Sequence, residues 1–251
     1  MLTASALDGL PEVRPGDDLA QLIVDALSPP HAALTCGDVL VVAHKVVSKA
    51  EGRVRRLQDV HPTARATEVA RRQGKDPRHV QVVLDESRSL LRAAHGVLIC
   101  VTHHGFVCAN AGVDASNAPA DDTVILLPRD PDASARALRQ RMKLLTGIAP
   151  GVVITDSFGR AWRNGQADVA IGCAGLTPFE DWRGRTDATG RELKATWIAV
   201  ADELASAADL ARAKDAFEPV ILLRGAGKHV TSDDGPGAAA LLRAENEDLF
   251  R

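Results

Sequence analysis

The sequence predicts an α/β or mixed α+β protein, because short apolar runs alternate with stretches that have the period of amphipathic helices. Three continuous apolar runs, at residues 39–43, 96–102 and 152–155, have the composition of strands that are buried on both faces of a sheet. The 251 residues are 45% hydrophobic and 25% charged. This mixture is typical of a globular chain that forms its core without disulfides, and it excludes disordered, collagen-like and coiled-coil chains. We find no repeat or linker, so we expect one domain over residues 1–251.

The first half of the chain is predicted to contain three helices between its strands. The first extends to Leu27, after an Asp17 or Asp18 cap and before the prolines at 29 and 30. The second covers residues 64–73. The third begins at Pro77, since proline is favourable in a first helical turn. Its apolar side is expected to include Val80, Val83, Leu84, Leu90 and Leu91.

The second half is predicted to continue the same alternation. We expect a strand at 123–127, a helix from Pro131 to about Leu145, the buried strand at 152–155 and a last strand at 219–223. A glycine-rich polar stretch covers 159–175. A long amphipathic helix is then expected, with Leu193, Trp197, Val200 and Leu204 on one face and Glu192, Asp202 and Glu203 on its solvated side.

Charge and composition limit the possible partners and the compartment. The formal net charge is −3 and the pI is about 6.2, whereas a general nucleic-acid-binding protein is usually basic. No apolar run approaches the roughly 20 residues of a membrane helix, and residues 1–8 lack the pattern of a signal peptide. We therefore expect a cytoplasmic protein that binds neither nucleic acid nor membrane. The four cysteines have no zinc-site spacing and are expected to be buried as small hydrophobic residues.

The strongest candidate site follows the apolar run 152–155. Asp156 and Ser157 supply two hard oxygen ligands of the kind that Mg²⁺ prefers, at a strand end where open α/β sheets bind ligands. Arg160, Arg163 and Asn164 add hydrogen-bond donors among glycines, a mixture that suits an anion. The alternative is that Asp156 is a helix N-cap.

Two further constellations point to a metal–phosphate site. Asp114 is a second acid in a loop of small residues after an apolar run, although its surroundings are also typical of an ordinary turn. Lys45 and Lys49 have the i, i+4 spacing that places both ammonium groups on one helical face, where a polyphosphate would relieve their repulsion. The alternative is a pair of solvated lysines. Walker A and dinucleotide-binding glycine motifs are missing from the sequence.

Four segments resemble the coenzyme F420:L-glutamate ligase family, whose members elongate the tail of a deazaflavin cofactor. They are residues 10–19, 37–53 (ending V-S-K-A-E-G-R), 104–117 (H-G-F-V-C-A-N-A-G-V-D-A-S-N) and 152–166 (V-V-I-T-D-S-F-G-R-A-W-R-N-G-Q). Weaker similarity continues through 199–225 and the acidic tail, so the resemblance covers nearly the whole chain. It implies a family-specific fold, an intertwined homodimer, and no activity of the reductase domain that some bacterial relatives carry.

The resemblance also implies a site and its ligands. The expected substrates are GTP, L-glutamate and the deazaflavin F420 precursor, with Mg²⁺ or Mn²⁺ at two sites and K⁺ left open as a further cation. Asp114 and Asp156 would bind one divalent ion, and Ser157 would bind the second. The residues matching GTP contacts are Leu10, Pro11, Glu12, Val13, His44, Lys45, Lys49 and Asn117.

Two positions depart from the family pattern. His44 stands where many relatives have a small hydroxyl residue. Archaeal relatives have, near the position of Lys214, a glutamine that helps hold the second metal. A protonated lysine cannot be a metal ligand, so we expect the second metal site to be weaker, or to be completed by water or substrate.

The expected reaction is GTP-dependent amide formation through an acyl phosphate. Lys49, Arg160 and Arg163 are the candidate catalytic residues, because they would hold phosphate oxygens and developing negative charge. A metal-dependent nucleotide hydrolase using the same acids and a non-catalytic nucleotide-binding protein are the alternatives. Turnover that depends on glutamate would distinguish the ligase from both.

Overall fold

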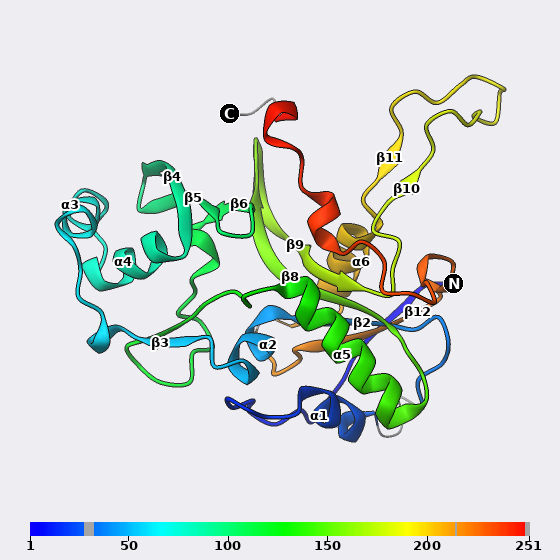
Figure 1. Cartoon of the computed structure of the whole chain (residues 1–251), viewed down its shortest axis with the longest axis horizontal. Coiled ribbons are helices and arrows are strands. Elements are labelled where there is room, and N and C mark those ends of the chain that lie inside the picture. Colours follow the sequence, from blue (N-terminus) through cyan, green and yellow to red (C-terminus); the bar gives the residue numbers. More distant parts are fainter. Residues whose placement is uncertain (28–32, 214, 249–251) are drawn as a thin grey trace.

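A five-stranded mixed sheet forms the centre of the computed structural model, which describes residues 1–27, 33–213 and 215–248 (Figure 1). Its strands, in spatial order, are β1 (Thr3–Ala6), β12 (Val220–Arg224), β2 (Val39–Ala43), β8 (Gly151–Arg160) and β9 (Arg163–Ala174). Only the central pair, β2 and β8, is parallel, and the other three pairings of this sheet are antiparallel. The predicted mixed α/β class is thus confirmed.

Helices cover both faces of this sheet. The first face packs against α1 (Leu19–Ala26) and α5 (Pro131–Thr146), and the second packs against α6 (Val200–Asp209). Leu40 and Val42 contribute to the first core, and Val39 and Val41 to the second, because successive strand residues point to opposite faces. This arrangement explains why the run 39–43 is apolar throughout.

A smaller lobe, formed by residues 54–126, has its own hydrophobic core and lies beside the sheet (Figure 1). It contains α3 (Ala64–Gln73), α4 (Pro77–Asp85), the pair β3 (Val54–Arg56) and β7 (Thr123–Ile125), and the sheet of β4 (Ser87–Ala94), β5 (Val97–Thr102) and β6 (Val107–Ala109). Five short 3₁₀ helices occur at Leu57–Asp59, Asn110–Gly112, Gly227–His229, Ala238–Leu241 and Glu245–Glu247 among the described residues.

Aspartate side chains cap several helix starts, and the cap of the first helix is one of the two that the sequence predicts. Asp18, Asp76 and Asp130 each accept a hydrogen bond from a backbone N–H in the first turn of α1, α4 and α5, respectively. The predicted stop at prolines 29 and 30 lies outside the described residues. The strands at 39–43, 96–102, 123–127 and 219–223 are confirmed to within two residues at each end.

The prediction that Leu90 and Leu91 continue a helix is wrong. Helix α4 ends at Asp85, and both leucines lie in β4, which pairs with β5. The two strands join through His95 and Gly96, whose φ values of 52° and 74° fit the two-residue hairpin turn that matches strand twist.

The predicted long helix around residue 200 is also shorter than expected. Helix α6 begins at Val200, whereas Trp197 lies in β11 (Trp197–Ile198), which pairs with β10 (Glu180–Asp181) at the base of an extended arm (Figure 1). Asp187 accepts backbone hydrogen bonds from Thr189 and Arg191 within this arm, and that turn interrupts any helix through Leu193. Asp202 is not a solvated residue, since it accepts a hydrogen bond from Ala170 N.

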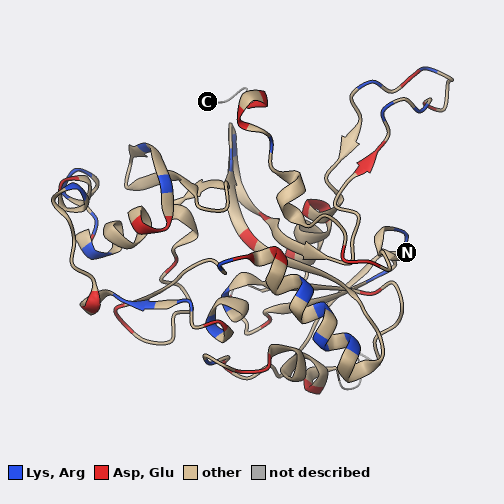
Figure 2. Cartoon of the chain, in the orientation of Figure 1, with Lys and Arg blue, Asp and Glu red and all other residues tan. Residues whose placement is uncertain are grey.

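Basic and acidic residues are interspersed over both lobes (Figure 2). Over the part of the chain that the structure describes, no helix has both the length and the apolar character needed to span a membrane.

Candidate functional site

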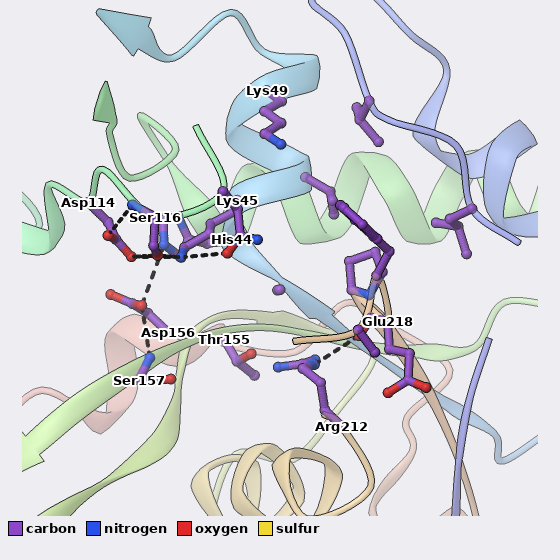
Figure 3. Close-up of a pocket in the computed structure, with 18 of the residues that line it drawn as sticks. His44, Lys45, Lys49, Asp114, Ser116, Thr155, Asp156, Ser157, Arg212 and Glu218 are labelled. Carbon is purple, nitrogen blue, oxygen red and sulfur yellow. Dashed lines mark hydrogen bonds and ion pairs between the residues drawn. The ribbon is translucent and has the colours of Figure 1, made fainter. Parts of the chain in front are cut away.

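A cavity of about 460 Å³ opens at the carboxyl ends of the parallel strands β2 and β8 (Figure 3). Its walls come from four parts of the chain: the loop at 10–13, the start of α2 (His44–Ala50), the loop at 114–117 and the described residues 212–213 and 216–219. Strands β8 and β9 form its floor. Every residue that the family resemblance implies for GTP or metal lines this cavity, namely Leu10, Pro11, Glu12, Val13, His44, Lys45, Lys49, Asp114, Asn117, Asp156 and Ser157.

The parallel pairing places His44 beside Asp156. Ala43 is the register partner of Thr155, so the residues that follow them emerge at the same edge of the sheet. His44 Nε2 lies 3.4 Å from Asp156 Oδ1, and His44 Nδ1 lies 3.3 Å from Ser48 Oγ. The imidazole is 2% exposed, and its Nε2 has no hydrogen-bond partner among the described residues. A buried polar atom of this kind favours a ligand or water beside it.

The two lysines of α2 face the cavity, as their spacing predicts. Lys45 Nζ lies 2.6 Å from Asp114 Oδ2, and Lys49 Nζ lies 2.6 Å from Glu12 Oε1. Both ammonium groups are therefore paired with carboxylates and are not solvated lysines. Lys49 is only 5% exposed.

Asp114 occupies a turn and also belongs to the site. Its backbone exchanges two hydrogen bonds with Ile125, and its carboxylate accepts hydrogen bonds from the backbone N–H and the hydroxyl of Ser116. Burial raises the pKa of Asp114, but the hydrogen bonds from Lys45 and Ser116 outweigh burial and hold the pKa below its usual value. The carboxylate is thus kept ionised.

Asp156 lies within a strand and is not a helix cap. Strand β8 continues through it to Arg160 and forms a hairpin with β9, so the glycine-rich polar stretch at 159–175 is mostly paired strand. A shift in the β8–β9 register between Ile154 and Thr155 precedes the site. Such irregularities change the direction of side chains near functional sites.

Asp168 is a site residue that sequence reasoning missed. It pairs with Ser157 across the hairpin, is 1% exposed, and accepts hydrogen bonds from Ser157 Oγ at 2.6 Å and Thr155 Oγ1 at 2.9 Å. Arg212, also overlooked, donates to it through Nη1 at 2.9 Å. The one sequence signal was an acid within the otherwise small and apolar run 167–174.

Arg160 and Arg163 are separate from the other predicted site residues. They lie exposed at the tip of the β8–β9 hairpin and do not line the cavity of their own chain. Arg160 Nη2 donates to the backbone carbonyl of Asn164 at 2.8 Å. Their predicted catalytic role is not explained by the geometry of one chain.

The carboxylates of Asp114 and Asp156 and the hydroxyl of Ser157 are hard oxygen donors on one cavity, the donor type that Mg²⁺ and Mn²⁺ prefer. Within the described ranges, no group of three or more His, Cys, Asp or Glu residues could hold a metal alone. Any ion there would need oxygen ligands from water or substrate as well. Lys214, where the sequence suggests a weaker second metal site, lies outside the described residues.

Comparison with known proteins shows which family the sequence belongs to. A sequence model of the family F420-0:Gamma-glutamyl ligase matches residues 9–225. Coenzyme F420:L-glutamate ligase of Methanopyrus kandleri is 47% identical over 96% of this chain and 94% of its own length. The proteins of the same name from Methanothermobacter thermautotrophicus and Haloarcula marismortui are 43% and 42% identical, each over 98% of this chain and over 97% and 94% of their own lengths, respectively. The chain belongs to the F420-0:gamma-glutamyl ligase family.

Proposed function

We propose that the chain is a GTP-dependent ligase that adds γ-linked L-glutamate to the tail carboxylate of a deazaflavin F420 precursor. The observation that carries this proposal is the cavity at the ends of β2 and β8, which combines two lysines with two acids suited to a divalent ion. Family membership supplies the acceptor and the amino acid, because the curated relatives are named coenzyme F420:L-glutamate ligase.

The lysines of α2 are proposed to bind the triphosphate. Lys45 lies beside the carboxylate of Asp114 and Lys49 beside that of Glu12, and these short-range pairs hold both ammonium groups at the cavity. When GTP binds, phosphate oxygens would replace or share those carboxylate partners. Asn117, with its Oδ1 3.5 Å from Lys45 Nζ, borders the same region.

Asp114, Asp156 and Ser157 are proposed to hold the divalent ions. Bound there, Mg²⁺ or Mn²⁺ would neutralise phosphate charge and polarise a phosphoryl oxygen. Asp168 accepts a hydrogen bond from the hydroxyl of Ser157, which leaves the lone pairs of Ser157 Oγ directed away from Asp168. The release of Asp114 from Lys45 would open one of its carboxylate oxygens to the ion.

The proposed reaction has two steps. An oxygen of the tail carboxylate attacks the γ-phosphorus, and the bond to the GDP oxygen breaks, which gives an acyl phosphate. The amine of L-glutamate then attacks the acyl carbon, loses a proton and expels inorganic phosphate. The protein contributes mainly by aligning the reactants and stabilising charge, with Lys49 held rigidly by burial and by Glu12.

We also propose that the enzyme works as a homodimer in the cytoplasm. The exposed tip of the β8–β9 hairpin carries Arg160 and Arg163 away from the cavity of its own chain. We therefore propose that these arginines exert their catalytic role in the site of a second subunit.

A mass-spectrometric assay tests the function. The protein is mixed with F420 precursor lacking glutamate, GTP, Mn²⁺ and L-glutamate, and glutamyl mass increments are measured. We expect increments that require GTP, that disappear in Asp156→Ala, and that persist in Asp181→Ala, an exposed strand acid outside the cavity. GDP release that ignores glutamate would instead identify a nucleotide hydrolase. GTP binding without turnover would identify a non-catalytic binding protein.

A further inference from the structure

Arg212 is a buried cation in the cavity wall that no step of the reaction above has used. It follows α6, and its side chain is 9% exposed. Nη1 donates to Asp168 Oδ2 at 2.9 Å, and Nε donates to the backbone carbonyl of Glu218 at 3.1 Å. In Figure 3, the guanidinium extends toward the cavity from the side opposite to Lys49 and Lys45.

One nitrogen of this guanidinium, Nη2, makes no hydrogen bond to the described residues. This nitrogen is also buried. A buried N–H without an acceptor is costly, and a charged one more so, because it has lost water without gaining a partner. Since the other two nitrogens are fixed, the guanidinium cannot turn to satisfy Nη2 without breaking an existing bond.

We propose that Arg212 Nη2 binds an anionic oxygen of a substrate, either a carboxylate or a phosphate oxygen. The inference rests on the proposed function for its list of substrates. A guanidinium donates only, never accepts, and its charge favours anions over carbonyls as partners. GTP, L-glutamate and the F420 precursor all carry such oxygens. The position of Arg212, across the cavity from the two lysines, gives the site anion-binding groups on two sides.

Asp168 is a positioning residue in this arrangement. Its carboxylate is almost wholly buried and accepts hydrogen bonds from Arg212, Thr155 and Ser157, so it holds the guanidinium of Arg212 in a fixed orientation at the cavity wall. The ion pair also offsets the charge that Arg212 brings into a buried position. Arg212 is thereby preorganised for an anion.

Binding measurements with separate probes identify the ligand. Calorimetric titrations use GTP with Mg²⁺, L-glutamate, and F420 precursor lacking glutamate, each on wild type, Arg212→Gln, Arg212→Lys and Arg141→Gln. Arg141 is the matched control, since it also pairs with a carboxylate, that of Asp18, but outside this cavity. Steady-state KM values for the three substrates provide a second readout.

We expect Arg212→Gln to weaken one probe at least ten-fold, about 1.4 kcal/mol, with partial recovery in Arg212→Lys and no change in Arg141→Gln. The probe that is weakened identifies the source of the anion. A folded Arg212→Gln variant that binds all three probes within two-fold of wild type would overturn the proposal. Equal weakening of all three would overturn it too, because it would indicate a general disturbance.

The proposal can still be tested if Arg212→Gln does not fold or if the wild type shows no turnover. If Arg212→Gln does not fold because Asp168 has lost the guanidinium of Arg212, the double variant Asp168→Asn/Arg212→Gln removes both charges and receives the same titrations under the same criteria. If wild type forms no glutamyl product, the proposed function fails. The titrations still test Arg212, since they need no turnover.

Discussion

The ammonium nitrogen of Lys45 lies 2.6 Å from Asp114 Oδ2 and joins two parts of the chain that are far apart in sequence. Lys45 belongs to α2, at the end of a central strand, and Asp114 belongs to a loop of the small lobe. The pair therefore holds the small lobe against the sheet on one side of the cavity (Figure 3). Its strength depends on the ionisation of Asp114.

The Lys45–Asp114 pair predicts an acid-sensitive part of the stability. The pKa of Asp114 in the folded protein is below its unfolded value of about 3.9, so the pair stabilises fully above that pH and is lost as pH falls through the folded pKa. We expect Lys45→Met to lower the free energy of unfolding near neutral pH, and the difference from wild type to shrink below about pH 4.

Urea denaturation at a series of pH values measures this difference. Lys143→Met, an exposed lysine on α5, is the control and should show little difference at any pH. A Lys45→Met difference that stays constant down to pH 3 would contradict the ion pair.

Gly172 predicts a strict size limit where α5 meets the sheet. A Cβ at this position of β9 would lie 2.4 Å from the backbone carbonyl carbon and oxygen of Pro131, the first residue of α5. We expect Gly172→Ala to destabilise the protein by about 1–3 kcal/mol, the usual cost of overpacking. Gly159→Ala, on the neighbouring strand, meets no atom within 4 Å and should change stability by less than about 0.5 kcal/mol. Equal denaturation midpoints for the two variants would contradict the close contact between position 172 and the backbone of Pro131.

Much of the site could be predicted because its residues follow apolar runs or have a helical period. Asp156 comes after a run that is buried on both faces, and Lys45 and Lys49 have helical spacing, so strand direction and helix geometry alone place them at one edge. Asp168 could not be placed in the same way. Its contact with Ser157 depends on the register of a hairpin that begins after the predicted end of the strand.

The errors in the fold have a related cause. Short apolar segments fit a helix or a strand equally well, and only pairing with a distant partner decides between them. Leu90 lies opposite Cys100 in the β4–β5 hairpin, and Trp197 lies opposite Asp181 in the arm. Neither partner can be identified from the local sequence pattern.

The cysteines are predicted to differ sharply in reactivity. The expectation that all four are buried is wrong for Cys36, which is exposed. Burial raises the pKa of Cys100, and raises the pKa values of Cys108 and Cys173 to about 12. Because the thiolate is the reactive form, iodoacetamide at pH 8 should modify Cys36 alone in the native protein and all four in guanidinium. Peptide mass mapping provides the readout, and native labelling of Cys108 or Cys173 at the rate of Cys36 would contradict the fold.

Arg160 and Arg163 predict complementation between subunits. Their hairpin tip is exposed and outside the cavity of its own chain, so the proposed catalytic role places them in the site of a second subunit. A subunit with Asp156→Ala would then lack a group of its own site. A subunit with Arg160→Ala/Arg163→Ala would lack the groups that it supplies to the site of the other subunit. Each homodimer should be inactive, but a mixed dimer should contain one intact site.

Co-expression of the two variants with different tags tests this expectation. Random pairing makes about half of the dimers mixed, so the unfractionated mixture should regain roughly a quarter of wild-type turnover. Doubly purified mixed dimers should show about half. If the arginine variant alone retains full activity, the two arginines have no catalytic role. If it is inactive and the mixture stays inactive, the arginines act on their own chain, and the hairpin would have to bend toward its own cavity during turnover.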